Sequence, residues 1–338
     1  MPLSFAQSRW LSLLPLLISL LVPHAAQAQA ATPDPAADLL QQGHDDLLRQ
    51  RYQDAMKAFK KANQLRHGTC ADCYFEMAVA LTRTGEFDEA LKSCDKAISC
   101  ATTDLVRTSS HTLKGNILQN MADDPKKLKA AEAEYRAALA LDTNSANAHL
   151  NLGVVLLRES LVAEGIEELK NYLRLAPDGP DANYATKLIA FPKKAGLPLA
   201  PNFEVRTLDG QVVSLHQLAG RIVVMDFWAT WCPPCVSSVP ELKNLTKKYS
   251  REQLVLISFS ADDDESSWRS FVAKKNMDWA QYWDHDGRIR NEFGVHAFPT
   301  YLVIDPDGFI HERIVGLDPQ KTVVARLKDT LQTMRPEK

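Results

Sequence analysis

The stretch "DFWATWCPPCVSSVPEL", residues 226–242, sets two cysteines two residues apart where an apolar run gives way to a helical pattern. The run "RIVVMDFW", residues 221–228, is rich in Val and Ile and is typical of a strand buried on both faces. A helix is predicted from Pro233 to about Tyr249. Cys232 and Cys235 therefore lie between a buried strand and the first turn of a helix.

This position favours thiol chemistry, because the thiolate is the reactive form of cysteine. The unpaired N–H groups and the dipole at a helix N-terminus stabilise negative charge. Cys235 follows Cys232 by one turn, so the two sulfurs can meet, and Pro233 fits a first turn. We predict a redox-active Cys232–Cys235 disulfide without metal or cofactor. A metal clamp and a purely structural staple are the alternatives, and no other ligand set is evident nearby.

The surrounding sequence predicts an α/β domain with a mixed sheet. Short strands flank Asp209-Gly210 in "FEVRTLDGQVVSL", and "LVLISFSA" is a second buried strand. A last hairpin is predicted around Asp307-Gly308. The acidic run 262–265 is interpreted as a solvated helix start. Before this domain, "FPKKAGLPLAPNF", residues 191–203, has three prolines and a glycine and reads as a domain boundary.

The C-terminal part resembles the thioredoxin fold, and more narrowly the TlpA/ResA group of thiol–disulfide oxidoreductases, of the redoxin/AhpC-TSA type. The resemblance is carried by "FWATWCPPC", by Pro240 within the predicted helix, and by "FPT", residues 298–300. It implies that Cys232 attacks and that Cys235 resolves the mixed disulfide. One departure is Ser238, where several members of the group carry a Glu that tunes the pair.

The resemblance also implies roles for residues outside the cysteine pair. Asp226 corresponds to a buried carboxylate that assists proton transfer at the second cysteine, the alternative being an Asp hydrogen-bonded at a strand edge. Pro299 corresponds to a cis-proline beside the pair. The candidate catalytic residues are thus Cys232, Cys235, Asp226 and Pro299. The residues expected to line a substrate groove are Trp231, Pro233, Phe298 and Thr300.

The N-terminal half contains a weak repeat with a period of 35 to 38 residues. Small residues open its four copies, and a second set of mostly larger residues follows in each. The first set is Gly43, Ala78, Gly115 and Gly153, and the second is Phe59, Cys94, Tyr135 and Leu169. The pattern resembles the tetratricopeptide repeat, in which helix pairs stack into a solenoid. A groove for a protein or peptide is expected, and a scaffold or dimer spacer is the alternative.

Four of the six cysteines lie in the second repeat. Cys70 and Cys73 begin its first helix, and Cys94 and Cys100 lie in the second half of its second helix. Antiparallel helices bring these ends together, so we expect the disulfides Cys70–Cys100 and Cys73–Cys94. The alternatives are buried free thiols and a zinc site, for which the spacing of the second pair is poor.

The N-terminus has the pattern of a secretory signal. Arg9 is the only charge before Asp34, and an apolar run is followed by an A-x-A site ending at Ala28. We expect a signal peptide over residues 1–28 and a periplasmic or secreted protein, with an uncleaved membrane anchor as the alternative. Charged residues make up 24% of the chain and the net charge is −3, so no large basic field suggests nucleic acid.

The sequence thus predicts a two-domain protein: an all-α tetratricopeptide-repeat solenoid of about four repeats over 36–185, a linker over 186–200, and a thioredoxin-like α/β domain with a mixed central sheet over 201–338. The expected function is an exported thiol–disulfide oxidoreductase, most simply a reductase acting on a protein thiol or disulfide. A membrane electron donor of the DsbD/CcdA type is an expected partner. The alternatives are a repeat-based adaptor with a vestigial thioredoxin domain and a thiol peroxidase, against which Ala229 argues because that chemistry needs Thr or Ser there.

Overall fold

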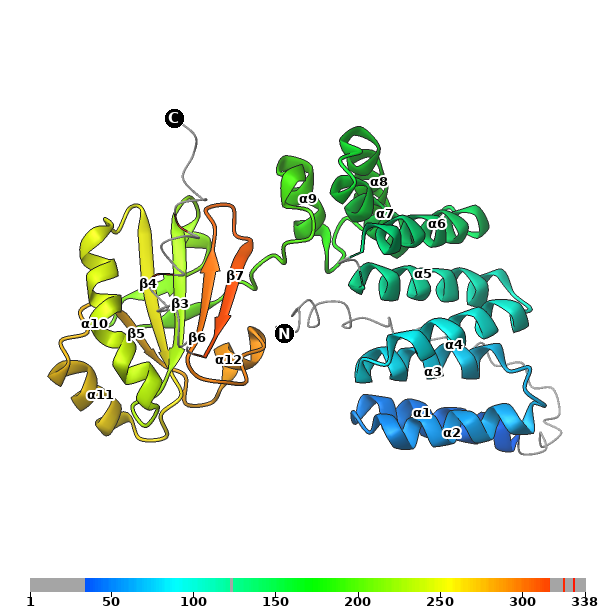
Figure 1. Ribbon diagram of the computed structural model, residues 1–338, viewed down its shortest axis with the longest axis horizontal. Coiled ribbons are helices and arrows are strands. Elements are labelled where there is room, and N and C mark those ends of the chain that lie inside the picture. The colour runs from blue at the N-terminus through cyan, green and yellow to red at the C-terminus, as the bar shows by residue number, and fades with distance from the viewer. Residues whose placement is uncertain (1–33, 122–123, 317–324, 326–330, 332–338) are drawn as a thin grey trace, which may run out of the picture. The chain divides into compact units, whose positions relative to one another are not determined.

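The chain divides into two units, Met1–Ala195 and Gly196–Lys338 (Figure 1). The computed structural model describes residues 34–121, 124–316, 325 and 331. The division falls within the proline-containing segment 186–200. The predicted signal peptide, residues 1–28, lies outside the described residues. Within the described part of the chain, no helix is both long and apolar enough to cross a membrane.

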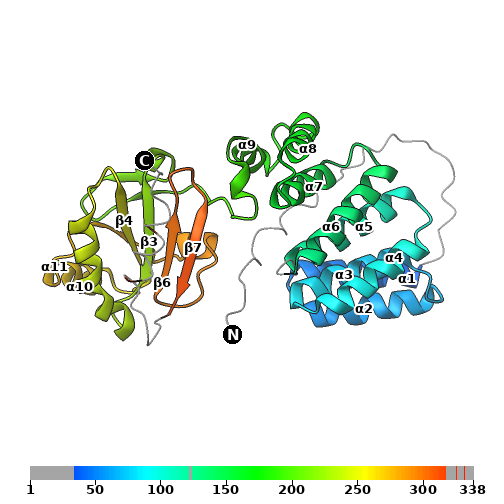
Figure 2. The same cartoon turned by 45° about the horizontal axis from the view of Figure 1, so that its top comes forward.

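The first unit is a stack of antiparallel helix pairs (Figure 2). Each helix packs on the next along the chain, which is the solenoid architecture that the repeat pattern predicts. The helices are α1 (Pro35–Leu48), α2 (Tyr52–Leu65), α3 (Ala71–Thr84), α4 (Phe87–Cys100), α5 (Asp104–Asn120), α6 (Pro125–Leu141), α7 (Ala146–Arg158), α8 (Val162–Leu175) and α9 (Ala182–Ala190), followed by the 3-10 turn η1 (Pro192–Lys194).

The small and large positions of the repeat face each other inside the helix pairs. A Cβ atom on Gly43 would lie 2.3 Å from the ring of Phe59, and one on Gly115 would lie 2.5 Å from the ring of Tyr135. Both rings are fully buried. The period in the sequence therefore arises because one helix of a pair must carry a small residue where the other helix packs closely against it.

The second unit is built on a five-stranded sheet of order β5-β4-β3-β6-β7. The strands are β3 (Ile222–Trp228), β4 (Leu254–Ser260), β5 (Ala280–Trp283), β6 (Thr300–Ile304) and β7 (Ile310–Val315). The three strands β3, β4 and β5 are parallel, and β6 and β7 run antiparallel to their neighbours. The mixed sheet predicted from the sequence is confirmed.

Helices cover both faces of this sheet, so β3 is buried on each side as its apolar run predicts. One face packs against α10 (Pro233–Lys248) and α11 (Glu265–Lys274). The other packs against α12 (Arg288–Glu292) and the residues around a small hairpin. The hairpin consists of β1 (Glu204–Arg206) and β2 (Val212–Ser214), and the 3-10 turn η2 (His216–Leu218) follows it.

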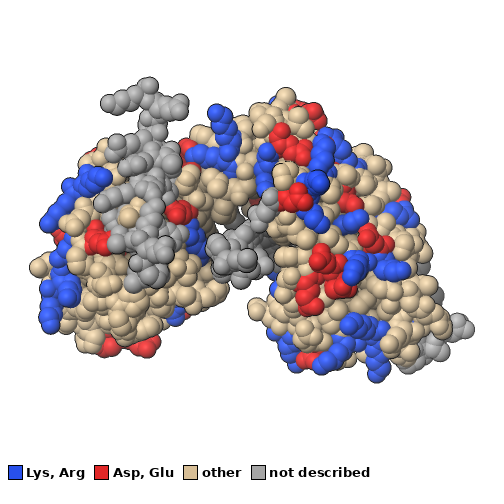
Figure 3. Space-filling view, in the orientation of Figure 1, with Lys and Arg blue, Asp and Glu red and all other residues tan. Residues whose placement is uncertain are grey.

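Lys and Arg lie among Asp and Glu on the repeat unit (Figure 3). Several of these charges pair between neighbouring helices. Lys114 of α5 contacts Asp95 of α4 at 2.8 Å and Glu134 of α6 at 2.7 Å. Arg136 of α6 reaches Glu164 of α8 at 3.2 Å. The two signs are therefore interspersed along the stack.

Candidate functional site

The sulfur of Cys232 caps the N-terminus of α10. Cys232 is the N-cap residue, and its Sγ accepts a hydrogen bond from the Cys235 N–H at 3.3 Å. The two cysteines form a disulfide. Cys232 is 5% exposed and Cys235 is 2% exposed. A thiolate at Cys232 would act as the side-chain acceptor at this helix start, in place of the usual oxygen. The free N–H groups of the first turn would stabilise its negative charge.

The loop before the cysteines is held by Asp262, which follows β4. Its carboxylate accepts from the Thr230 N–H at 3.0 Å and from the Thr230 hydroxyl at 2.6 Å. The Ser260 hydroxyl donates to the same carboxylate at 2.6 Å. Asp262 is buried, so its interpretation as part of a solvated helix start is wrong. The exposed Asp264 is the cap of α11 instead.

Aromatic side chains lie at the mouth of the pair. Trp231 is 60% exposed and meets the ring of Phe298 edge to face, with ring centroids 5.9 Å apart. The Phe298–Pro299 peptide bond is cis. Pro233 is exposed at the first turn of α10. The substrate groove expected over Trp231, Pro233 and Phe298 stays a prediction.

Thr300 does not present its side chain to such a groove. It is buried, and its hydroxyl donates to the Ala297 carbonyl oxygen at 2.7 Å. The hydroxyl therefore holds the turn that precedes β6, and the expectation that this side chain lines the surface is wrong. The motif "FPT" does place Thr300 directly after the cis-proline Pro299.

Asp226 lies in β3 on the face that packs against α10. Its same-face neighbours, Val224 and Trp228, belong to the apolar cluster that also contains Cys232 and Cys235. Asp226 is buried, and burial raises its pKa to about 7, while a hydrogen bond from Ser258 offsets part of that rise.

The two carboxylate oxygens of Asp226 differ. Oδ2 accepts from the Ser258 hydroxyl at 2.7 Å, and Ser258 in turn accepts from the Trp279 indole N–H at 2.8 Å. Oδ1 is buried and has no hydrogen-bond partner among the described residues. A carboxyl held on one oxygen, with the other free and a pKa near neutrality, can take up and release a proton.

Tyr301 was not singled out from the sequence, although it pairs with Asp226 across β3 and β6. Burial raises the pKa of Tyr301, and the charges of Asp226 and Glu241 raise it further, while Ser238 lowers it. Ser238, at the departure from the family pattern, thus faces Tyr301 and donates to the Pro234 carbonyl oxygen at 3.1 Å.

Ser258 could have been found from the sequence, because it is a polar residue inside the apolar run 254–261.

The arrangement as a whole supports two-electron thiol–disulfide exchange. It combines a capped sulfur at a helix start, a second sulfur one turn on and a buried carboxyl on the same face of the sheet. Throughout the described residues, no group of three or more His, Cys, Asp or Glu is placed to hold a metal ion.

Comparison with known proteins agrees with this chemistry. The redoxin family matches residues 194–331, and a tetratricopeptide-repeat family matches residues 127–180. The thiol-disulfide oxidoreductase ResA of Bacillus anthracis is 33% identical over 129 residues, which are 38% of this chain and 75% of that protein. The chain belongs to the ResA family of thiol–disulfide oxidoreductases. The family likeness covers its second unit.

Two further similarities lie in the same part of the chain. The thioredoxin-like protein YneN of Bacillus subtilis is 32% identical over 130 residues, covering 38% of this chain and 76% of that protein. A crystal structure of a putative thiol:disulfide interchange protein DsbE from Chlorobium tepidum has 27% sequence identity and a TM-score of 0.38. It covers 41% of this chain and 96% of that one.

The cysteines of this oxidoreductase's repeat unit are paired differently from the sequence prediction. Cys70 and Cys73 form a disulfide, with Cα atoms 5.2 Å apart, and Cys94 and Cys100 are free. The expected pairs Cys70–Cys100 and Cys73–Cys94 are therefore wrong. The physical reason is the direction of the side chains.

Cys73 and Cys94 pack in two different apolar clusters. Cys70 and Cys73 pack with Ala36 of α1 and Ala62 of α2. Cys94 packs with Ala78 and Ala90 of its own helix pair and with Ile117 of α5. The observed bond closes a loop of four residues, which constrains the unfolded chain by only about 2 kcal/mol in the chain-entropy model.

The free thiols give a test of this pairing. We expect iodoacetamide to modify Cys100 in the native protein without reductant, because Cys100 is half-buried and unbonded. Cys94 should resist until the protein unfolds, since burial raises the pKa of its thiol to about 12. At about pH 8 that leaves roughly one thiolate in ten thousand. Peptide mass mapping reads both sites, and modification of Cys100 only after reduction would contradict the structure.

The buried carboxyl predicts a pH-dependent stability. The folded-state pKa of Asp226 is raised from 3.8 to about 7, so the folded protein binds the proton more tightly than the unfolded chain. The free energy of unfolding should therefore fall as pH rises from about 4 to about 7, by up to roughly 4 kcal/mol from this group. Asp226→Asn should remove that part of the slope in urea denaturation of the oxidised protein.

The control for this measurement is Asp278→Asn, which removes an exposed carboxylate from the same unit. It should keep the slope of the unsubstituted protein. A difference in stability between Asp226→Asn and the unsubstituted protein that stays constant across this pH range would contradict the protonation of Asp226.

Proposed function

We propose that this oxidoreductase is an exported reductase of protein disulfides, with Cys232 as the attacking sulfur. The observation that carries the proposal is the capped Cys232–Cys235 pair packed in one apolar cluster with the face of β3 that bears Asp226. A nucleophilic sulfur needs its negative charge stabilised, and the N-terminus of α10 supplies that. The mouth of the site, with the exposed Trp231, provides an apolar surface for a polypeptide substrate.

The reaction begins from the reduced pair. The Cys232 thiolate attacks one sulfur of a substrate disulfide, and the other substrate sulfur leaves as a thiolate that is then protonated. The Cys235 thiol next loses its proton and attacks Cys232 Sγ. The second substrate sulfur leaves, and the Cys232–Cys235 disulfide remains. Two electrons have passed to the substrate, which is released as a dithiol.

Asp226 is the proposed proton acceptor for Cys235. Its pKa near 7 lets it exist in both protonation states near neutrality, and Oδ1 is the oxygen not engaged by Ser258. A base for Cys235 speeds the resolving step, which frees the reduced substrate. In this role Asp226 acts on the Cys235 thiol, and it does not need to contact the substrate.

Export and the supply of electrons belong to the same proposal. The signal-like sequence over residues 1–28 supports delivery to the periplasm or outside the cell, where a membrane donor of the DsbD/CcdA type would return electrons to the oxidised pair. Cleavage after Ala28 predicts that the protein recovered from the periplasm lacks residues 1–28. Intact mass spectrometry distinguishes this from a full-length, membrane-retained protein with an uncleaved anchor.

The repeat unit would hold a protein or peptide partner. Support comes from the stacked helix pairs and the tetratricopeptide-repeat match at residues 127–180. The alternative, an adaptor with a weakly active redox unit, differs in one respect that can be measured, which is whether Cys232 and Cys235 cycle at all.

The reduction potential of the Cys232/Cys235 pair tests the direction of electron flow. In glutathione or dithiothreitol buffers we expect a reversible couple at about −250 mV or lower, as for reductases of this fold. Cys70→Ser with Cys73→Ala isolates this couple from the repeat-unit disulfide. A value near −120 mV would instead make the protein an oxidant. No reversible couple would favour the adaptor.

A further inference from the structure

The disulfide of the repeat unit repeats the local geometry of the redox site. Cys70 is the N-cap residue of α3, with φ −79° and ψ 95°, and Cys232 caps α10 with φ −97° and ψ 100°. The Cys70 Sγ accepts from the Cys73 N–H at 3.2 Å, against 3.3 Å at the second pair. Each pair therefore sets one sulfur at a helix start and its partner one turn inside.

In both pairs the cysteine at the helix start is more exposed than the cysteine one turn inside. Cys70 is 8% exposed and Cys73 is fully buried, while Cys232 is 5% exposed and Cys235 is 2% exposed. In each pair the outer cysteine is the one that an incoming thiolate can reach. Cys70 as a residue is thus no less exposed than the cysteine that carries the family's activity.

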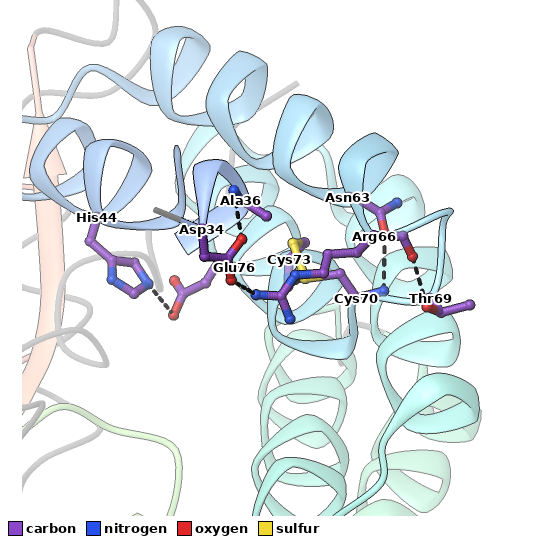
Figure 4. The surroundings of a disulfide bond; sticks show 9 residues. All are labelled: Asp34, Ala36, His44, Asn63, Arg66, Thr69, Cys70, Cys73 and Glu76. Atoms are coloured by element: carbon purple, nitrogen blue, oxygen red, sulfur yellow. Dashed lines mark hydrogen bonds and ion pairs between the residues drawn. A yellow bond between two sulfur atoms is a disulfide. The ribbon is translucent and has the colours of Figure 1, made fainter. Parts of the chain in front are cut away.

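The chain around Cys70 is fixed by bonds that do not involve the disulfide (Figure 4). The Asn63 side-chain oxygen accepts from the Cys70 N–H at 3.1 Å, and the Asn63 carbonyl oxygen accepts from the Gly68 N–H at 2.8 Å. Thr69 donates its hydroxyl to the Arg66 carbonyl oxygen at 2.8 Å. Arg66 also pairs with Asp34, which caps α1.

These bonds bear on what the disulfide does for the fold. The turn before α3 is held by hydrogen bonds, a reduced cysteine sulfur is still a hydrogen-bond acceptor, and the closed loop spans four residues. A link this short restricts the unfolded chain little. We therefore expect the bond to open and close without loss of the structure that presents it.

We propose that Cys70–Cys73 is a second thiol–disulfide exchange site, which accepts two electrons from a thioredoxin-type dithiol such as Cys232/Cys235. The donor thiolate attacks Cys70 Sγ, the Cys70–Cys73 bond breaks, and Cys73 leaves as a thiolate that takes a proton. The second donor thiol then loses its proton and attacks the first donor sulfur. Cys70 is released and protonated, the donor becomes a disulfide, and the repeat unit holds a dithiol.

Two full-length variants test this exchange. One keeps only the repeat-unit pair and carries Cys232→Ser and Cys235→Ala. The other keeps only the second-unit pair and carries Cys70→Ser and Cys73→Ala. Serine retains an N-cap acceptor at each helix start, and alanine avoids a buried hydroxyl at the inner position.

The oxidised first variant is mixed with the reduced second variant without oxygen, quenched with acid, alkylated and mapped by peptide mass. We expect Cys70 and Cys73 to become reduced as Cys232 and Cys235 become oxidised. Because C-x-x-C pairs of this geometry span about 150 mV in reduction potential, the equilibrium constant should lie within about 10^5-fold of unity. Far-UV circular dichroism of the first variant should be unchanged after reduction.

A trapping arm identifies the attacked sulfur. When the donor carries Cys235→Ala in addition to Cys70→Ser and Cys73→Ala, its Cys232 should accumulate as a mixed disulfide with Cys70 of the first variant. Linkage to Cys73 instead would overturn the assignment of the outer sulfur. Asp72→Asn supplies an electrostatic readout, because this exposed acid lies in the first turn of α3. Its removal should shift the equilibrium toward the dithiol by about two- to fivefold.

The proposal is overturned if Cys70–Cys73 stays oxidised in the native protein and is reduced only after unfolding, or if its reduction unfolds the helices. Dithiothreitol used as the donor keeps the test independent of the second unit. Exchange with dithiothreitol but not with Cys232/Cys235 would overturn the pairing with a thioredoxin-type donor. Neither outcome depends on the direction in which Cys232/Cys235 works on its substrates.

Discussion

The redox site depends on one hydrogen bond, from the Cys235 N–H to the Cys232 sulfur. A helix start leaves N–H groups without partners, and where a side chain accepts from one of them, the acceptor is usually an oxygen of Ser, Thr, Asp or Asn. Here sulfur does so, which fixes the reactive atom in the field of α10 and makes capping and activation the same interaction. The loop before it must then be immobile, and buried Asp262 holds that loop by its bonds to Thr230.

The second constraint is a carboxyl placed where burial is costly. Asp226 lies in the middle of the sheet, between β4 and β6, and its pKa rises because the charged form loses its water. The Ser258 hydroxyl, itself held by the Trp279 indole, satisfies one oxygen and keeps the side chain in place. A carboxyl with a hydrogen bond to one oxygen and none to the other is the arrangement expected of a proton carrier. Hydrogen bonds to both oxygens would stabilise the charged form and lower the pKa.

Much of this could be predicted from the sequence, because the signals are local. An apolar run ending in C-x-x-C before a helical pattern fixes the strand, the cap and the pair, and the glycine period fixes the helix pairs through contacts such as Gly115 with Tyr135. The supports of the site were missed because they arise from register between strands. Ser258 and Asp262 become meaningful only once β4 is placed beside β3, and no spacing in the chain announces that neighbour.

The same distinction explains the cysteines of the repeat unit. The expected pairing of Cys73 with Cys94 assumed only that antiparallel helices bring their ends together, yet each helix also has faces. Cys73 packs with residues of α1 and α2, whereas Cys94 packs with residues of its own helix pair and of α5. What decides the bond is the helix start at Cys70, where a sulfur in the N-cap position lies within reach of one on the next turn. Because that geometry is local, it forms as readily at the start of a solenoid helix as after the central strand of an α/β sheet. A C-x-x-C pair at a helix start is therefore a unit of structure that either fold can carry, while the supports around it, such as Asp226 and Asp262 at the second pair, come from the fold.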